Sequence, residues 1–435
     1  MNKARKTALV FSIVATLIFS LTACEGTAEH LERDPGKEPV TLTLWHQWVT
    51  EANPHNNSLK QAIRVWNGQN PDVIIQAIAV NGEQYKTKIK TALAAGEAPD
   101  LFYIWGGSFI IPYVKSGNIL PLDRYLEDGT KDRLGAGMLE ACTYNGASYA
   151  LPVFTFIANL YCNTELFNKA GAQIPSTFDE LLEAVKKLRA AEITPIVVGE
   201  KDRWPGMYWY DILAMRQAGG QACLNALNRP MLFEEEDFTE AARKLSLLVK
   251  SGAFNRDAFE MGFMEMMEEF KQGKAAMIYQ GNWADANCED SKSLVKGKVE
   301  IVPFPLLQDG KGKKDEFFGG DVDGFSISMN TKYPVEAVRV LKFICEKASR
   351  DGYLIGAGLP CWKTDGLDDS TLAPTAGQSA KLIRTGTTFV GWWDTIFSAA
   401  DSEIHKDLVA ELFAGKKTPE EFTAEMAKLN GASDF

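Results

Sequence analysis

The chain has 435 residues, with 46 basic and 57 acidic side chains and a formal net charge of −11. This acidic balance argues against a nucleic-acid-binding protein and against a polybasic grip on anionic lipid. The length is sufficient for two or three domains, and beyond the N-terminal segment no stretch is apolar for long enough to span a membrane.

The N-terminal segment, residues 1–23, has the features of an export signal. Basic residues near the start precede an apolar run from Ala8 to Leu21, which is short for a membrane span but typical of a signal peptide. The run ends in Leu21-Thr-Ala-Cys24, which resembles a bacterial lipobox, and the alternative is an ordinary secretory signal with an incidental cysteine. We expect Cys24 to be lipidated and the polar residues 24–39 to form a tether.

Six further cysteines follow Cys24, and none lies in a Cys-x-x-Cys or Cys/His metal spacing. An exported protein with six cysteines can form disulfides. Apolar surroundings such as Phe343-Ile-Cys345 suit a reduced, buried thiol equally well, so the pairing stays open. The four histidines do not cluster in the sequence, and we expect no metal site.

The first third of the chain alternates between expected strands and amphipathic helices. Strands are expected at Val40–Trp45, Val73–Val80 and Leu101–Trp105, with one helix between each pair. This β-α-β-α-β order predicts a parallel sheet with right-handed crossovers. Ligands of such sheets bind beyond the carboxyl ends of the strands. The binding candidates there are His46, Gln47, Trp48, Glu83 and Trp105.

Extended segments recur in the middle of the chain, at Tyr149–Phe156 and Leu160–Asn163. A helix begins at the capping box Thr177-Phe-Asp-Glu180. A strand at Thr194–Gly199 then leads to the aromatic run Trp204–Trp209, and these aromatic residues are again placed where a strand ends.

The segment from Gly273 to Trp283 contains the most informative strand end. Ala276–Tyr279 is a short apolar run that predicts a buried strand. Gly281 permits a close approach that a Cβ would resist, and an amide and an indole follow at Asn282 and Trp283. The alternative is an ordinary turn with the indole in the core.

Later segments add acidic and aromatic candidates. Phe317–Gly324 is glycine-rich and acidic, without the lysine that a phosphate-binding loop needs. A strand is expected at Phe325–Met329, and the chain after Pro334 is expected to be mostly helical. A capping box at Thr418-Pro-Glu-Glu421 begins the last helix.

Flat rings next to carboxylates and amides suit a sugar, because rings cover its C–H faces and the polar groups bind its hydroxyls. A charged amino acid would need an arginine beside the rings, and a ferric site would need convergent tyrosines. Two nearby carboxylates, such as Asp321 and Asp323, could also hydrolyse a glycosidic bond. The candidate ligand-binding residues are His46, Gln47, Trp48, Glu83, Trp105, Phe154, Trp204, Tyr208, Trp209, Asn282, Trp283, Asp321, Asp323, Trp362, Trp392 and Asp394.

Several short motifs occur together in one order. They are Leu44-Trp-His46, Thr91–Asp100, Gly117–Asp123, Tyr149–Pro152, Tyr161–Phe167, Gly273–Met277 and Gly281-Asn-Trp283. In this combination the chain resembles the extracellular solute-binding proteins of bacterial ABC sugar importers, the maltose-binding-protein-like family, from about Val40 to near its C-terminus. One departure is Cys162, where the family normally has a second aromatic residue.

The resemblance implies an α/β, periplasmic-binding-protein-like fold of two lobes with a hinge and a ligand cleft between them. Its lobes are expected at 40–152 with 282–327 and at 153–281 with 328–435. The chain is expected to cross between lobes near Leu151–Thr155, Tyr279–Trp283 and Phe325–Thr331.

The resemblance also implies a function. The protein is expected to be a monomer without a cofactor or catalytic activity. It would capture a carbohydrate, expected to be an oligosaccharide, and deliver it to the permease subunits of an ABC importer by hinge closure. It would sit on the extracellular face of the cell membrane, anchored through Cys24. The alternatives are a secreted carbohydrate-active enzyme and a sugar-sensing lipoprotein that presents its ligand to a receptor.

Overall fold

The structure is a computed structural model that describes residues 39–51 and 53–432, except for the side chain of Glu83. The described residues belong to one compact unit, Pro39–Phe435. The expected signal peptide, the lipidated Cys24 and all of the tether except Pro39 lie outside the described residues.

A ten-stranded sheet organises this unit, and seven of its strands follow the order β2-β1-β3-β10-β6-β8-β7. The first three are β1 (Val40–His46), β2 (Val73–Ala79) and β3 (Leu101–Trp105). Strand β1 pairs in parallel with both β2 and β3. The parallel β-α-β-α-β start predicted from hydrophobic alternation is therefore confirmed, with α1 (Pro54–Gln69) and α2 (Gly82–Ala95) as its helices.

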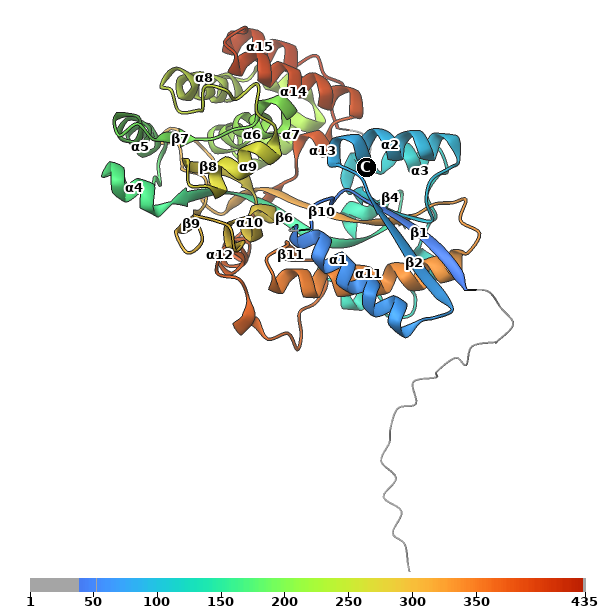
Figure 1. Cartoon of the computed structure of the whole chain (residues 1–435). Helices are drawn as coiled ribbons and strands as arrows, with labels where there is room; N and C mark the ends of the chain where they lie inside the picture. The colour runs from blue at the N-terminus through green and yellow to red at the C-terminus, as the bar shows by residue number, and fades with distance from the viewer. Residues whose placement is uncertain (1–38, 52, 433–435) are drawn as a thin grey trace, which may run out of the picture. The chain divides into compact units, whose positions relative to one another are not determined.

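Two long strands connect the halves of the sheet. Strand β6 (Ala150–Asn163) pairs with β10 (Glu316–Ile327) along its first part and with β8 (Ala275–Gly281) along its second part. Strand β10 also pairs with β3, antiparallel. Figure 1 shows β6 and β10 running between the first half of the sheet, with β1–β3, and the second half, with β8 and β7 (Thr194–Ile196).

Helices cover both halves, and the contacts group them. Helix α11 (Pro334–Leu354) packs against α1 beside the first half, whereas α6 (Trp204–Ala218) packs against α8 (Glu236–Lys250) and α14 (Ala399–Phe413) beside the second. The remaining helices are α3 (Ile111–Lys115), α4 (Thr164–Ala170), α5 (Phe178–Ala190), α7 (Gly220–Asn228), α9 (Phe263–Lys271), α10 (Asp285–Glu289), α12 (Pro374–Ile383), α13 (Trp393–Ile396) and α15 (Pro419–Met426).

Short strands complete the sheet. Strand β9 (Val299–Val302) and β11 (Leu359–Pro360) pair with β6, and β12 (Thr388–Val390) pairs with β10. A separate hairpin joins β4 (Thr143–Tyr144) to β5 (Ala147–Ser148) through Asn145 and Gly146, both at positive φ.

The contacts between elements neither confirm nor contradict the predicted boundaries of the two lobes. Helix α11 lies in the predicted second lobe at 328–435 but packs against α1, and β9 lies in the predicted first lobe at 282–327 but pairs with the second part of β6. The lobe boundaries therefore stay a prediction.

Local signals explain several element boundaries. Both capping boxes are present, at Thr177 with Glu180 and at Thr418 with Glu421. All residues of β6 and β8 are buried, as expected for strands covered on both faces. The six cysteines from Cys142 to Cys361 are buried and free, so none of them forms a disulfide.

No helix within residues 39–51 and 53–432 is long and apolar enough to cross a membrane. Over the same described part of the chain, no group of three His, Cys, Asp or Glu side chains could hold a metal ion.

Candidate functional site

Four predicted aromatic residues come together in the second half of the molecule. Trp204 and Tyr208 lie one turn apart on α6, Trp283 follows β8, and Trp392 precedes α13. The ring of Tyr208 stacks on Trp392 at 4.9 Å between centroids, Trp283 lies 5.5 Å from Trp392, and Trp204 lies 6.0 Å from Trp283. We call Trp204, Tyr208, Trp283 and Trp392 the four-ring cluster.

The residues before Trp283 explain how its ring is held. A Cβ on Gly281 would lie 2.3 Å from the nearest ring atom of Trp283, so only glycine lets this indole fold back on its own strand. The backbone N–H of Ile157 donates to Asn282 Oδ1 at 2.8 Å, which ties this segment to β6.

The same segment carries two hydrogen-bond donors without a partner. Asn282 Nδ2 and Trp283 Nε1 are buried and have no partner among the described residues. An unmet buried donor costs about 1–3 kcal/mol, so both donors suit an oxygen atom of a ligand or of water.

The four-ring cluster rests on the two strands that connect the halves. Phe156 of β6 lies 5.3 Å from Trp283, and Phe318 of β10 lies 4.7 Å from Trp392 and 4.9 Å from Tyr208. The cluster therefore sits over the crossing of β6 and β10, between the two halves of the sheet.

Two carboxyl groups of β10 lie beside this cluster. Asp321 accepts a hydrogen bond from the backbone N–H of Trp392, and Asp323 accepts one from the hydroxyl of Tyr103. Burial raises the pKa of both carboxyls to about 7; the neighbouring Asp394 adds to the effect at Asp321, and Asp321 adds to it at Asp323. Near neutral pH each group can accept hydrogen bonds as an anion or donate one as an acid.

The strand ends of the first half form a second aromatic group. Trp48 stacks on His55 at 5.2 Å and meets Tyr103 edge-on at 5.1 Å, and Trp105 meets Tyr103 at 5.0 Å. Gln47 hydrogen-bonds to Tyr103 as well. His55 lies 5.9 Å from Phe156, so this group is continuous with the four-ring cluster through Phe156.

His46 belongs to the support of this second group. It is 3% exposed, and its Nδ1 accepts from the backbone N–H of Trp48 at 3.3 Å. Burial, followed by repulsion from Lys60, lowers the pKa of His46 to about 4. The ring is therefore neutral at physiological pH and can accept this hydrogen bond.

Three other predicted residues lie in the hydrophobic core. Trp209 packs on Phe254, Tyr279 and Phe304. Trp362 donates its Nε1–H to the carbonyl of Pro152 at 2.8 Å, and Phe154 is fully buried. In this structure each of the three is at most 1% exposed, and a contact with the ligand stays a prediction for them. Glu83 lies in the first turn of α2, and its side chain is outside the described part of the chain.

Comparison with known proteins shows the family to which this chain belongs. Residues 52–350 match the family described as bacterial extracellular solute-binding protein. The chain belongs to this family. A solved structure from a study of xylan utilization by the thermophilic bacterium Caldanaerobius polysaccharolyticus is 42% identical, with a TM-score of 0.86, and the match covers 89% of this chain and 99% of that one.

Two more distant solute-binding proteins share the similarity. A chitin oligosaccharide binding protein of known structure is 24% identical with a TM-score of 0.80, covering 90% of this chain and 98% of that one. The multiple sugar-binding protein of Streptococcus mutans is 23% identical over 81% of each chain. The resemblance inferred from the short motifs is confirmed, and so is the two-lobed α/β fold of the solute-binding proteins.

Sequence reasoning missed three residues of this solute-binding protein that contact the predicted set. Tyr103 was hidden inside an apolar strand, although alternation places it on the same face as Trp105. Phe156 and Phe318 lie inside the expected segments Tyr149–Phe156 and Phe317–Gly324 and were not named as candidates. Only the pairing of β6 with β10 reveals that they lie under the rings.

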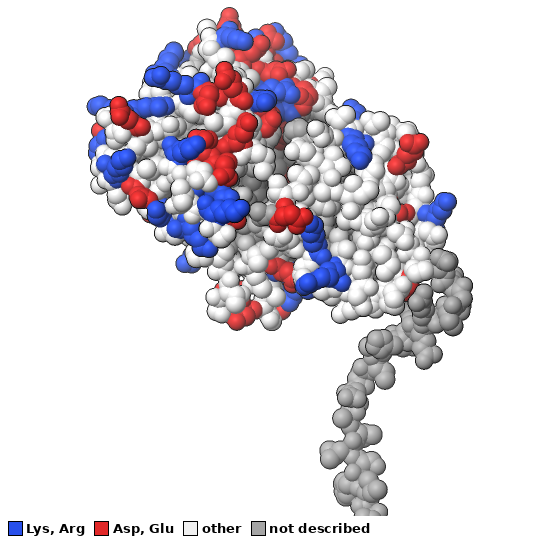
Figure 2. Space-filling view, in the orientation of Figure 1, with Lys and Arg blue, Asp and Glu red and all other residues white. Residues whose placement is uncertain are grey.

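The surface of the solute-binding protein agrees with a site between the halves. Figure 2 shows a hollow between the half with α6, α8 and α9 and the half with α2 and α3, with acidic side chains gathered along its rim. Two cavities, of about 330 and 420 Å³, lie elsewhere and are lined by none of the predicted residues. The convergence of rings, carboxyls and unmet donors is the stronger guide, because those groups provide the chemistry for a polar ligand.

Proposed function

We propose that this solute-binding protein captures a carbohydrate outside the cell and delivers it to an ABC importer. The observation that carries the proposal is the four-ring cluster with Asp321 and Asp323 beside it. Rings can cover the C–H faces of a sugar while the two carboxyls, Asn282 Nδ2 and Trp283 Nε1 bind its hydroxyls. Relatives named for binding sugars, including the multiple sugar-binding protein of Streptococcus mutans, support the same class of ligand.

The ligand to test first is an oligosaccharide of xylan. The 42% identical structure comes from a study of xylan utilization, and the other neighbours include a chitin oligosaccharide binding protein. Several rings in a row suit a chain of sugar units better than a single one. The stacked rings of Tyr208 and Trp392 leave no space between them, so the ligand is expected on their outer faces.

Delivery is proposed to follow closure of the two halves about β6 and β10. A ligand favours closure only through contacts that it gains in the closed form. Candidates for these contacts lie in the first half, at Gln47, Trp48 and Trp105, opposite the four-ring cluster. The energy for transport is supplied by the importer, so the binding protein itself is proposed to act without a cofactor and as a monomer.

The anchor and the location complete the proposal. Members of this family are extracellular solute-binding proteins. We propose that this one is held to the outer face of the membrane by lipid on Cys24, because of the lipobox-like Leu21-Thr-Ala-Cys24. The mass of the mature N-terminal peptide tests this assignment.

A titration of the mature chain from residue 25 with mono- and oligosaccharides tests the proposal, with calorimetry and tryptophan fluorescence as readouts. We expect saturable binding near micromolar affinity, and a loss of at least about tenfold in Trp283→Ala and Trp392→Ala. Trp66→Phe is the control, because Trp66 packs on Phe343 and has no ring contact with the cluster.

Three outcomes would change the conclusion. Sugar affinity within error of wild type in both alanine variants would remove the four-ring cluster from the site. Shorter sugars in the reaction mixture would favour the carbohydrate-active enzyme. Binding without recovery of a permease complex from membranes would favour the sensor lipoprotein.

A further inference from the structure

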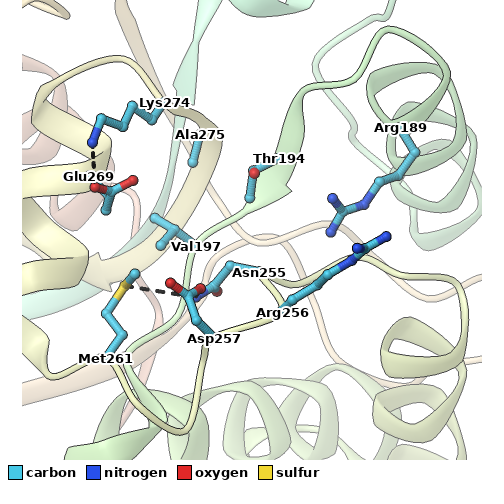
Figure 3. A pocket seen from close by; sticks show the side chains of 10 residues that line it. All are labelled: Arg189, Thr194, Val197, Asn255, Arg256, Asp257, Met261, Glu269, Lys274 and Ala275. Carbon is cyan, nitrogen blue, oxygen red and sulfur yellow. Dashed lines mark hydrogen bonds and ion pairs between the residues drawn. The ribbon is translucent and has the colours of Figure 1, made fainter.

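One of the two cavities named above lies in the second half of the molecule, apart from the proposed sugar site, and its lining is polar. Its volume is about 330 Å³, which is at the lower end of the range for small-molecule sites. Its lining comes from the end of α5, from β7, from the loop before α9 and from the start of β8 (Figure 3). The lining residues are Arg189, Thr194, Val197, Asn255, Arg256, Asp257, Met261, Glu269, Lys274 and Ala275.

Partners can be assigned to most charged groups of this cavity. Lys274 forms an ion pair with Glu269 at 2.7 Å, and Asp257 accepts from Asn255 Nδ2 at 2.8 Å. Neither carboxylate pairs with an arginine. Glu269 is therefore paired with Lys274, whereas Asp257 keeps its negative charge. With three cationic and two anionic side chains, the lining keeps a net positive charge, and neither arginine has an ion-pair partner in it.

Arg189 is held rigidly at the cavity wall. Its Nε–H donates to the carbonyl of Gly252 at 2.6 Å, and its Nη2 donates to the carbonyl of Phe254 at 2.5 Å. Carbonyl oxygens fix the plane of the guanidinium but carry no net charge. Burial, followed by repulsion from Arg256, lowers the pKa of Arg189, which is the electrostatic sign of an unneutralised pair.

Arg256 completes the pair. Figure 3 shows its guanidinium next to that of Arg189 at one end of the cavity. Among the described residues, Arg256 has no hydrogen-bond or ion-pair partner. Each guanidinium presents a fork of N–H donors that matches the geometry of a carboxylate, and a bound carboxylate would offset the mutual repulsion of the two groups.

We propose that this cavity is a binding site for a small organic carboxylate, separate from the sugar site. The carboxylate binds to Arg256 and to the N–H groups of Arg189 that do not donate to Gly252 and Phe254. No group reacts, so the site holds an organic acid as a second ligand.

The test uses the mature chain with sodium citrate and sodium succinate as probes, against sodium chloride at matched ionic strength. We expect saturable binding by calorimetry with a dissociation constant below about 1 mM, and a loss of at least about tenfold in Arg256→Ala. Arg256 is exposed and makes no contact that folding needs. The variant should therefore keep the wild-type melting temperature and sugar affinity.

Matched controls decide the result. Arg64→Ala removes another arginine, one whose partner is Gln61 on α1, and it should bind the probes like wild type. The proposal is overturned if chloride reproduces the response, if Arg256→Ala binds as tightly as wild type, or if no probe binds. Failure of sugar binding leaves this measurement readable, because the probes report on the cavity alone.

Discussion

Asp285 shows how one buried carboxyl couples folding to pH. It is 1% exposed, and its Oδ1 accepts from Tyr161 at 2.6 Å and from Ser379 at 3.0 Å. Burial raises the pKa of Asp285 to about 7 despite these two hydrogen bonds. Between about pH 4 and pH 7 the folded chain therefore holds a proton that the unfolded chain has released, and this group makes the fold less stable as pH rises.

Buried histidines act in the opposite direction over the same range. Burial lowers the pKa of His55 and of His405 to about 3. As pH falls below about 6.5 the unfolded chain gains protons that the folded chain rejects, so these groups destabilise the fold in acid. The two kinds of group offset each other, and a broad stability maximum is expected instead of a steep acid transition.

Asp285→Asn should reveal the carboxyl contribution. The amide oxygen can still accept from Tyr161 and Ser379, but the group no longer titrates. Relative to wild type, the variant should gain up to a few kcal/mol of unfolding free energy between pH 4.5 and pH 7.5, since one unit of pKa shift corresponds to about 1.4 kcal/mol. Urea unfolding at several pH values measures this. The exposed Asp309→Asn is the control, and a difference from wild type that stays constant with pH would contradict the assignment.

At the scale of elements, the segment where β6 and β10 pair is closely packed and irregular. The register between these strands shifts twice, once between Gly319 and Val322 and once between Asp323 and Gly324. A Cβ on Gly324 would lie 2.2 Å from the carbonyl oxygen of Leu151. The obstacle is backbone, so the strands would have to separate.

Gly324→Ala should therefore destabilise the fold by about 1–3 kcal/mol or more. Because Asp323 is the next residue, the variant should also lose sugar affinity at temperatures where it is folded. Gly68→Ala is the matched control: nothing lies within 4 Å of its Cβ position on α1, and alanine is expected to be neutral or stabilising by up to about 1 kcal/mol. Urea unfolding compares the two, and equal midpoints would argue against the close approach.

The elements also show which local sequence signals were sufficient to predict a strand. The strands β1, β2 and β3 were predictable because their apolar residues alternate over a sufficient length. From the sequence, the residues of β10 were predicted to form a glycine-rich loop, which contains Gly319, Gly320 and Gly324, followed by a strand. The reason is that glycine and aspartate have low strand propensity. Pairing on both sides overrides that propensity, and pairing between distant segments cannot be read from local sequence.

Helix α6 explains why the candidate site was only partly predictable. Treated as a loop, the run Trp204–Trp209 offered three equivalent aromatic residues. As a helix, it places Trp204 and Tyr208 on one face and turns Trp209 by about 100° toward the core. The composition of the run predicted aromatic rings at the site, but only the helical geometry selects which of them face the cluster.

At the scale of the whole molecule, β10 pairs with β3 of the first half, β6 pairs with β8 of the second half, and the two strands pair with each other. In the described part of the chain, the two halves of the sheet are joined through this pair of strands. A change in the angle between the halves must pass through them. Strand β10 provides two left-handed residues in this region, Gly319 at φ 119° and Gly320 at φ 97°. Glycine tolerates such angles with little strain, so the crossing can bend where the pairing is already irregular.

Closure should then be visible as compaction of the chain in solution. Small-angle X-ray scattering with saturating oligosaccharide should lower the radius of gyration by roughly 1 Å from the ~21 Å expected for a compact chain of this length. Trp283→Ala at the same sugar concentration should show no change, because it lacks the contact that favours the closed form. An unchanged radius in wild type, with calorimetric binding intact, would mean that the ligand is held without closure. Recognition by the importer would then depend on the ligand surface itself.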